Sequence, residues 1–335
     1  MPSVRARIQP KPPAKMLTVE GETSRLWGVV LAGGEGVRLR RLTRYLCGDE
    51  RPKQYACLLG ARSMLRQTVD RLTLGIPLER TVVVGRRSHQ DYLGEEFLGI
   101  PRPPLLLQPE DRGTGMAVLL AAHWIAKRDP DAILGLFPTD HFVREEPAFM
   151  SHVMRVATFV DRHPERLVLV AATPTGPEPQ YGWIETGGPV GWVAGEPVLQ
   201  VRSFHEKPDR ALARVFMQRG YVWNTLILLA AVATLLDTGR RLLPELSDRL
   251  AAIAGDLDED DGEQALTQVY ASVPAVNFSR AFLEPCPPCL TAAHLPAGVT
   301  WVDWGTPGRV VRSLRSAGIT PQWLLGLDGG LAGLS

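Results

Sequence analysis

Residues 26–39 read Leu-Trp-Gly-Val-Val-Leu-Ala-Gly-Gly-Glu-Gly-Val-Arg-Leu, and this stretch decides the fold. Its apolar first part, residues 26–32, is typical of a strand buried on both faces of a parallel sheet. The glycines that follow let the backbone turn tightly and present N–H groups to phosphate oxygens. A tight connection without a ligand would also explain these glycines, so the loop needs support from other residues.

The loop matches neither of the two common phosphate-binding patterns. A G-x-G-x-x-G that starts at Gly34 would need glycine at Leu39, and no Gly-Lys-Ser/Thr closes a Walker A loop. A nicotinamide-dependent oxidoreductase is therefore a remote alternative.

Strands and helices alternate after this stretch. The apolar spacing predicts strands at residues 81–84, 105–107, 132–137 and 167–172, and helices at 63–74, 115–126 and 149–160. This alternation predicts an α/β fold with a mostly parallel, Rossmann-like sheet covered by helices on both faces.

The second half of the chain has a different texture. Short strands are expected at residues 183–186, 192–193 and 198–204, and helices at 208–219 and 230–250. We expect a flexible lead-in at residues 1–24, one α/β domain at 25–310 that includes a smaller mixed substrate lobe at about 173–300, and a short tail at 311–335.

Composition limits the partners. The 335 residues carry 37 Lys and Arg against 36 Asp and Glu, so no overall field favours nucleic acid or an anionic membrane. The apolar runs are far shorter than the roughly 20 residues that span a bilayer. Four cysteines fit a reduced, cytoplasmic protein. Cys286 and Cys289 form a lone C-x-x-C, for which buried apolar packing is a simpler explanation than metal or redox chemistry.

Two basic residues and one carboxylate support a phosphate site. Arg38 and Lys53, the latter within Arg51-Pro52-Lys53-Gln54-Tyr55, follow the first strand and together favour a polyphosphate ligand. Asp140 follows the strand at residues 132–137, at the edge where open α/β sheets bind ligands. A carboxylate there suits Mg²⁺, although capping of the segment that follows is an equally simple role.

These motifs resemble a known family. Residues 31–42 followed by Pro52-Lys53-Gln54 are similar to the signature of the sugar-1-phosphate nucleotidyltransferases, and most similar to the mannose-1-phosphate guanylyltransferase branch. The resemblance extends over residues 26–310 and implies the GT-A-like nucleotidyltransferase fold. Val37 and Arg41 stand where that family usually has threonine and proline.

The resemblance implies a nucleotide site and a metal site. The segment Gln108 to Thr114 resembles the family's base-recognition segment, although Gly113 stands where guanylyltransferases usually carry asparagine. Trp301 to Thr306 resembles W-x-D-x-G-[ST], so Asp140 and Asp303 would hold Mg²⁺. The implied nucleotide-binding residues are Leu31, Ala32, Gly33, Gly34, Gly36, Gln108, Gly113 and Thr114.

Three further segments resemble the family's sugar-phosphate site. They are Tyr181-Gly182-Trp183-Ile184-Glu185, Phe204-His205-Glu206-Lys207-Pro208 and Trp223-Asn224-Thr225. Gly182, Glu185 and Asn224 would contact the sugar and Lys207 its phosphate. A surface ion pair between Glu206 and Lys207 is the simpler alternative. Leu226 replaces the family's glycine.

The implied activity is transfer of a nucleotidyl group from a nucleoside triphosphate to a sugar 1-phosphate with release of pyrophosphate, with GTP and mannose 1-phosphate as the expected pair. Two alternatives are another nucleotide with another hexose 1-phosphate, and an inactive regulatory homologue that binds a nucleotide sugar. A homo-oligomer is compatible with the sequence. The expected catalytic residues are Arg38, Lys53, Asp140 and Lys207.

Overall fold

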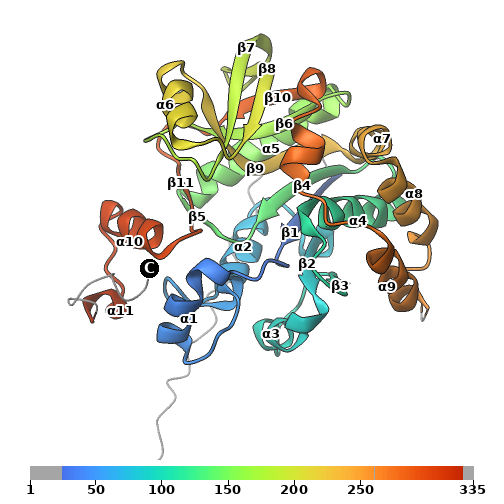
Figure 1. The fold of residues 1–335 in the computed structure, drawn as a ribbon, viewed down its shortest axis with the longest axis horizontal. Coiled ribbons are helices and arrows are strands. Elements are labelled where there is room, and N and C mark those ends of the chain that lie inside the picture. Colours follow the sequence, from blue (N-terminus) through green and yellow to red (C-terminus); the bar gives the residue numbers. More distant parts are fainter. Residues whose placement is uncertain (1–24, 260, 327–335) are drawn as a thin grey trace, which may run out of the picture.

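A nine-stranded sheet forms the centre of the molecule (Figure 1). The computed structural model describes residues 25–259 and 261–326, so the expected lead-in at residues 1–24 lies outside the described residues. The strand order is β3-β2-β1-β4-β9-β6-β10-β8-β7. The strands are β1 Leu26–Leu31, β2 Thr81–Arg86, β3 Leu105–Gln108, β4 Ile133–Pro138, β6 Leu167–Ala172, β7 Gly182–Val193, β8 Glu196–Glu206, β9 Val222–Ala231 and β10 Leu290–His294.

Strands β3, β2, β1 and β4 pair in parallel, and we call them the parallel half. Within β1, Val29 and Val30 are both fully buried although they face opposite sides. The predicted first strand, buried on both faces of a parallel sheet, is therefore confirmed.

The remaining strands form what we call the closed half, comprising β9, β6, β10, β8 and β7. Here β9 is antiparallel to both β4 and β6, and β7 is antiparallel to both β8 and β9. Because β7 returns to β9, these five strands close on themselves.

The single helix predicted for residues 230–250 is wrong. Ala231 still belongs to β9, and Pro244 starts a second helix because proline cannot continue the first.

Helices cover both faces of the sheet, as predicted. On one face of the sheet, an apolar cluster includes residues of α4, α7, α8 and α9. On the other face, a second cluster includes residues of α2, α3, α5 and α6. The helices are α1 Arg40–Cys47, α2 Met64–Leu72, α3 Gln90–Glu96, α4 Gly113–Arg128, α5 Glu146–Arg162, α6 Arg210–Gln218, α7 Val232–Leu242, α8 Pro244–Ile253, α9 Gly262–Ser272, α10 Pro307–Ser316 and α11 Gln322–Leu325. None of the described helices is long and apolar enough to cross a bilayer.

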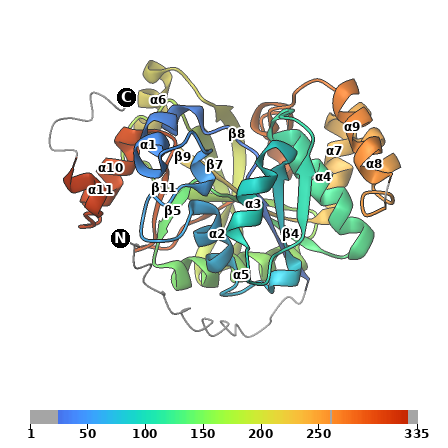
Figure 2. The same cartoon turned by 90° about the horizontal axis from the view of Figure 1, so that it is seen from below.

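A third apolar cluster joins the first helix to the last part of the described chain. Leu42 of α1 packs with Trp304 and with Val310 and Leu314 of α10. A two-stranded sheet of β5 His141–Arg144 and β11 Thr300–Asp303 lies beside this cluster. Figure 2 shows α1 and α10 together at one end of the molecule and α8 and α9 at the other. The boundary expected after residue 310, between the α/β domain and the tail, falls inside α10 Pro307–Ser316.

Candidate active site

A cavity of about 570 Å³ lies at the carboxyl ends of β1 and β4. Such an edge is where open α/β sheets bind ligands. Ten predicted site residues meet in this one cavity. Its lining is formed by Leu31, Gly33, Gly34, Gly36, Val37, Arg38, Lys53, Gln54, Val84, Gln108, Asp111, Gly113, Thr114, Ala117, Pro138, Thr139, Asp140, Leu226, Ala275, Val276, Asn277 and Gly305.

The glycine-rich loop is held in place by the segment that carries Lys53. Gly36 has φ +63°, and a Cβ there would lie 2.8 Å from the backbone N of Lys53, so only glycine fits this approach. The buried amide of Gln54 donates to the carbonyls of Ala32 and Gly34, at 2.8 Å each. Ala32 itself does not line the cavity. The positioning role of Gln54 was missed by the sequence reasoning, and its place beside Lys53 was the available signal.

The loop also contains an acid, Glu35, which would repel a phosphate. Arg40 donates to one of its oxygens at 2.8 Å, and Arg86 pairs with the other. The two guanidinium groups neutralise Glu35 and leave the loop compatible with an anion.

Gln108, which also lines the cavity, is only 4% exposed. Its amide donates to the Gly85 carbonyl at 3.3 Å, and its Oε1 accepts from the Tyr270 hydroxyl at 3.0 Å. A Cβ at Gly33 would lie 2.7 Å from the Gln108 amide nitrogen. Tyr270 therefore fixes the orientation of Gln108, a role that no sequence motif indicated.

Gly113 begins α4 with φ +81°, in the left-handed region. A Cβ there would lie 2.4 Å from the carbonyl oxygen of Val276. Glycine and asparagine are the residues that adopt this conformation most readily. Asparagine could adopt this backbone conformation, but its Cβ would collide with the Val276 backbone, so only glycine fits here. Thr114 next to it accepts a bond from the Phe278 N–H at 3.1 Å.

Lys53 and Asp140 form an ion pair at the cavity wall, with side chains 13% and 24% exposed. Burial, the largest single influence, would raise the pKa of Asp140, but the charge and hydrogen bond of Lys53 together with His141 outweigh burial and hold that pKa well below its ordinary value. Burial lowers the pKa of the adjacent His141 to about 4, so its imidazole is neutral at pH 7.

The pairing of β5 with β11 brings the second predicted carboxylate to the first. Asp303 lies opposite His141 in this antiparallel pair, and the Trp304 N–H donates to the Asp140 carbonyl at 2.8 Å. Burial, followed by the negative charge of Asp140, raises the pKa of Asp303 to about 6. The Oδ1 atom of Asp303 is buried and has no hydrogen-bond partner among the described residues.

Arg38 lies at the entrance, between the cavity and the loop before β7. Its guanidinium pairs with the Gln180 side chain, and a Cβ at Gly305 would lie 3.1 Å from it. To hold a triphosphate, Arg38 would exchange Gln180 for phosphate oxygens. A second arginine, Arg309, also bonds Gln180, at 3.3 Å. The sequence reasoning did not identify Arg309.

The predicted sugar residues do not line this cavity. Glu185 accepts from the Ser203 hydroxyl at 2.9 Å, and Lys207 pairs with Glu206 at 2.9 Å. Lys207 is 49% exposed, whereas Glu206 is 7% exposed. Gly182 packs so tightly that a Cβ would lie 2.8 Å from the Phe204 ring. Close packing is therefore a sufficient reason for this glycine.

Asn224 and Leu226 form an irregular part of β9. The Asn224 side chain accepts from the Leu226 N–H at 3.1 Å, and Leu226 has φ +62°. A left-handed leucine inside a strand is strained. Leu226 nevertheless lines the cavity, at the position where the resembling family has glycine.

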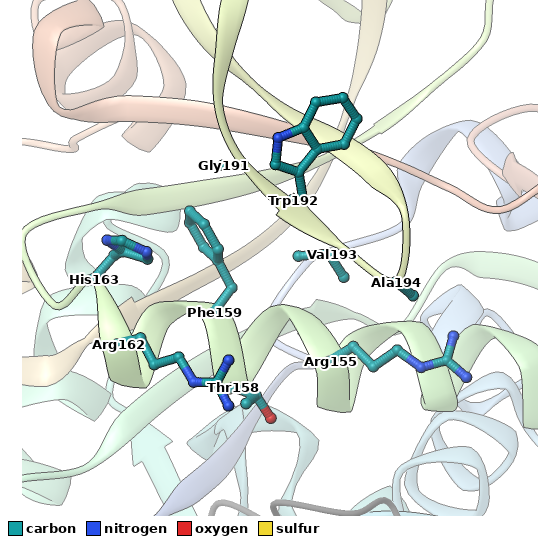
Figure 3. Close-up of a pocket in the computed structure, with 9 residues that line it drawn as sticks. All are labelled: Arg155, Thr158, Phe159, Arg162, His163, Gly191, Trp192, Val193 and Ala194. Atoms are coloured by element: carbon teal, nitrogen blue, oxygen red, sulfur yellow. The ribbon is translucent and has the colours of Figure 1, made fainter.

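Two features lie apart from this cavity. A second cavity of about 290 Å³ lies between α5 and the β7–β8 turn, is lined by residues that include Arg155, Arg162 and Trp192, and contains no predicted site residue (Figure 3). Cys286 and Cys289 are free thiols; Cys289 ends a single turn of 3-10 helix, Pro287–Cys289, and Cys286 directly precedes it. Within residues 25–259 and 261–326, no three His, Cys, Asp or Glu side chains gather to hold a metal.

A parallel sheet with a glycine loop, fixed cations and partly buried carboxylates beside its carboxyl edge defines a class of α/β protein that binds phosphorylated ligands. The chain belongs to the nucleotidyl transferase family, whose model matches residues 27–314.

Three relatives illustrate the similarity. The xanthan biosynthesis protein XanB of Xanthomonas campestris pv. campestris (strain B100) is 30% identical over 83% of this chain and 57% of the relative. A mannose-1-phosphate guanylyltransferase of Escherichia coli (strain K12) is 29% identical over 84% of this chain and 58% of the relative. The solved mannose-1-phosphate geranyltransferase of Thermus thermophilus superposes with a TM-score of 0.71, at 29% identity over 84% of this chain and 76% of that one. The chain thus spans little more than half the length of the curated relatives.

Proposed function

We propose that this chain transfers a nucleotidyl group from a nucleoside triphosphate to a sugar 1-phosphate, which yields a nucleotide sugar and pyrophosphate. One observation carries the proposal. The glycine loop, Arg38, Lys53 and Asp140 converge at the carboxyl edge of a parallel sheet, in a cavity of about 570 Å³. Fixed cations beside a loop of backbone N–H groups suit a triphosphate.

In the proposed mechanism, an oxygen of the sugar 1-phosphate attacks the α-phosphorus in line, the bond to the β-phosphate oxygen breaks, and pyrophosphate leaves. The attacking monoester is already ionised, so the protein needs no strong general base. Arg38 and Lys53 would stabilise the charge that moves onto pyrophosphate, and Lys207 would hold the incoming phosphate. Positioning and charge neutralisation carry such reactions.

Asp140 and Asp303 would hold Mg²⁺, which when bound neutralises charge on the phosphate oxygens. Their donor set fits this ion, because both are carboxylates, and the buried Oδ1 of Asp303 has no hydrogen-bond partner among the described residues. A pair of carboxylates leaves further positions for phosphate oxygens and water. Lys53 would turn from Asp140 toward the triphosphate.

For the substrates we propose GTP and mannose 1-phosphate. The names of the Escherichia coli and Thermus thermophilus relatives both contain mannose 1-phosphate, which supports the sugar. The word guanylyltransferase in the name of the Escherichia coli relative also supports the nucleotide. The four free cysteines are compatible with a reducing, cytoplasmic environment.

The test is pyrophosphate release with Mg²⁺, measured for each of four nucleoside triphosphates with each of several hexose 1-phosphates. We expect GTP with mannose 1-phosphate to give the highest kcat/KM. A different best pair would refute the substrate assignment and retain the reaction. No turnover with any pair, together with measurable binding of a nucleotide sugar, would establish the inactive regulatory homologue instead.

A further inference from the structure

Arg309 is the buried cation nearest to the proposed metal carboxylates that the mechanism does not use. It lies in the first turn of α10, where the Thr306 side chain accepts from its N–H. Its side chain is only 6% exposed, and the guanidinium lies over the Tyr181 ring at 4.6 Å. A buried guanidinium is costly unless its charge is paired, so its partners indicate its role.

Its partners come from two segments that are far apart in sequence. Nη1 donates to Asp303 Oδ2 at 2.7 Å, whereas Nη2 lies 3.3 Å from Glu178 Oε1 and donates to Gln180 Oε1 at 3.3 Å. One guanidinium therefore joins the last residue of β11 to the loop that leads into Gly182 and β7. The planar fork of arginine suits such divided contacts, and a lysine would not reproduce them.

The two oxygens of the Asp303 carboxylate differ in their contacts. Oδ2 is held by Arg309, whereas Oδ1 is buried without a partner among the described residues. The Asp303 carboxylate therefore has a fixed orientation with one oxygen available. The charge of Arg309 is already shared by two carboxylates, so a direct role in binding substrate phosphate is unfavourable.

We propose that Arg309 is a positioning residue that fixes Asp303 so that Oδ1 alone is offered to the divalent cation beside Asp140. Through Glu178 and Gln180, Arg309 also links Asp303 to the loop before β7, which leads into the proposed sugar-binding residue Gly182. This inference rests on the proposed function, because it assumes a metal at Asp140 and Asp303. Partners that orient a metal-binding side chain contribute substantially to metal affinity.

The sign of the effect distinguishes positioning from simple electrostatics. By charge alone, removal of a cation next to a cation site should strengthen metal binding. If Arg309 acts by orienting Asp303, its removal should weaken metal binding in spite of the more negative site. A weakened affinity is therefore a result that neither simple electrostatics nor a purely structural role predicts.

The experiment is direct titration of the nucleotide-free protein with Mn²⁺, with free Mn²⁺ followed by electron paramagnetic resonance. We expect Arg309→Met to weaken Mn²⁺ binding about 10-fold, within the range seen for such partners. Arg309→Lys keeps the charge without the fork and should weaken binding less. The lysine variant keeps the proposal testable if the methionine variant fails to fold.

Arg312→Met is the matched control, because Arg312 is an exposed residue of the same helix. It should bind Mn²⁺ as the unmodified chain does. Unchanged or tighter binding in folded Arg309→Met, or in Arg309→Lys where the former does not fold, would overturn the inference. Absence of Mn²⁺ binding in the unmodified chain, or binding that persists in Asp303→Asn, would remove the nucleotide-free metal site on which this inference rests, without bearing on pyrophosphate release in the presence of nucleotide.

Discussion

The parallel half and the closed half share one sheet, yet they present their predicted site residues in opposite ways. In the parallel half, the glycine loop, Lys53 and Asp140 lie around one cavity. In the closed half, Glu185 and Lys207 are bonded to their own neighbours, Ser203 and Glu206. Parallel strands bring successive loops to the same edge, so distant residues converge there without a ligand. Antiparallel strands place successive connections at opposite edges of the sheet, so fewer loop side chains converge at one edge.

The largest expected effect tests the convergence in the parallel half. Asp140→Asn removes the proposed metal ligand and the partner of Lys53, so we expect pyrophosphate release to fall by about 10³-fold or more. Asp303→Asn should have a comparable effect. Asp131→Asn changes an exposed carboxylate just before β4 and should leave the rate unchanged. Substantial turnover in Asp140→Asn with an intact circular dichroism spectrum would refute its metal role.

The parallel half could be predicted from local sequence, for physical reasons. The strand at Leu26 and the glycines after it are adjacent in the chain, and each is recognisable from residue type alone. Asp140 could be placed because it follows a buried strand, and Gln108 could be placed through the resemblance of its segment to a family motif. Tyr270 could not, because it reaches Gln108 from a helix 162 residues away and belongs to no motif.

The closed half was less predictable. Trp223 and Asn224 were recognised through a family motif, but β9 around them was not predicted, and Ala230 and Ala231 were assigned to a helix. Strand β9 is buried between β4 and β6, and a short apolar run of this kind does not distinguish strand from helix. Arg309 was missed because its partners, Glu178 and Asp303, meet only after the chain has folded.

A smaller effect is expected for Lys207, which tests whether the closed half binds the sugar phosphate. Lys207→Ala should raise the KM for the sugar 1-phosphate about 10-fold to 100-fold, or about 1.4–2.7 kcal/mol, with the nucleotide KM unchanged. Steady-state kinetics with each substrate varied separately would measure this. Arg210→Ala, an exposed cation nearby, is the control. Equal changes in both KM values would contradict the assignment of the two substrates to different halves.

A third prediction asks whether the two halves fold as one unit. Helix α4 packs against β1 and β2 of the parallel half, whereas α5 packs mainly against strands of the closed half, above all β9. Burial lowers the pKa of His123 in α4 and of His152 in α5 to about 4, from an ordinary value of 6.5. The unfolded chain therefore takes up these protons first as the pH falls. Stability conferred by each neutral histidine is complete above pH 6.5 and declines as the pH falls toward 4.

Urea denaturation at pH 7 and pH 5 measures this loss. His152→Gln should reduce the difference in unfolding free energy between the two pH values by about 1–2 kcal/mol. Ser151→Ala, beside His152 in the same helix, removes no titrating group and should not change it. If His123→Gln and His152→Gln both shift one common transition, the contrast between the halves concerns ligand contacts and not folding. Two separate transitions would extend the contrast to folding.

The smallest expected effect concerns Leu226, where the two halves meet. Strand β9 pairs with β4 from Leu228 onward and with β7 up to Asn224, so the irregular conformation at Leu226 lies where β9 changes partners. Leu226→Ala keeps the left-handed strain, whereas Leu226→Gly relieves it. The glycine variant should therefore be more stable than the alanine variant by about 1 kcal/mol in urea denaturation. At Ala230, which lacks this conformation, Ala230→Gly should reverse the sign and cost about 0.5–1 kcal/mol. If Leu226→Ala proves the more stable variant, the left-handed conformation carries no strain, and the residue that joins the halves is chosen for its side chain alone.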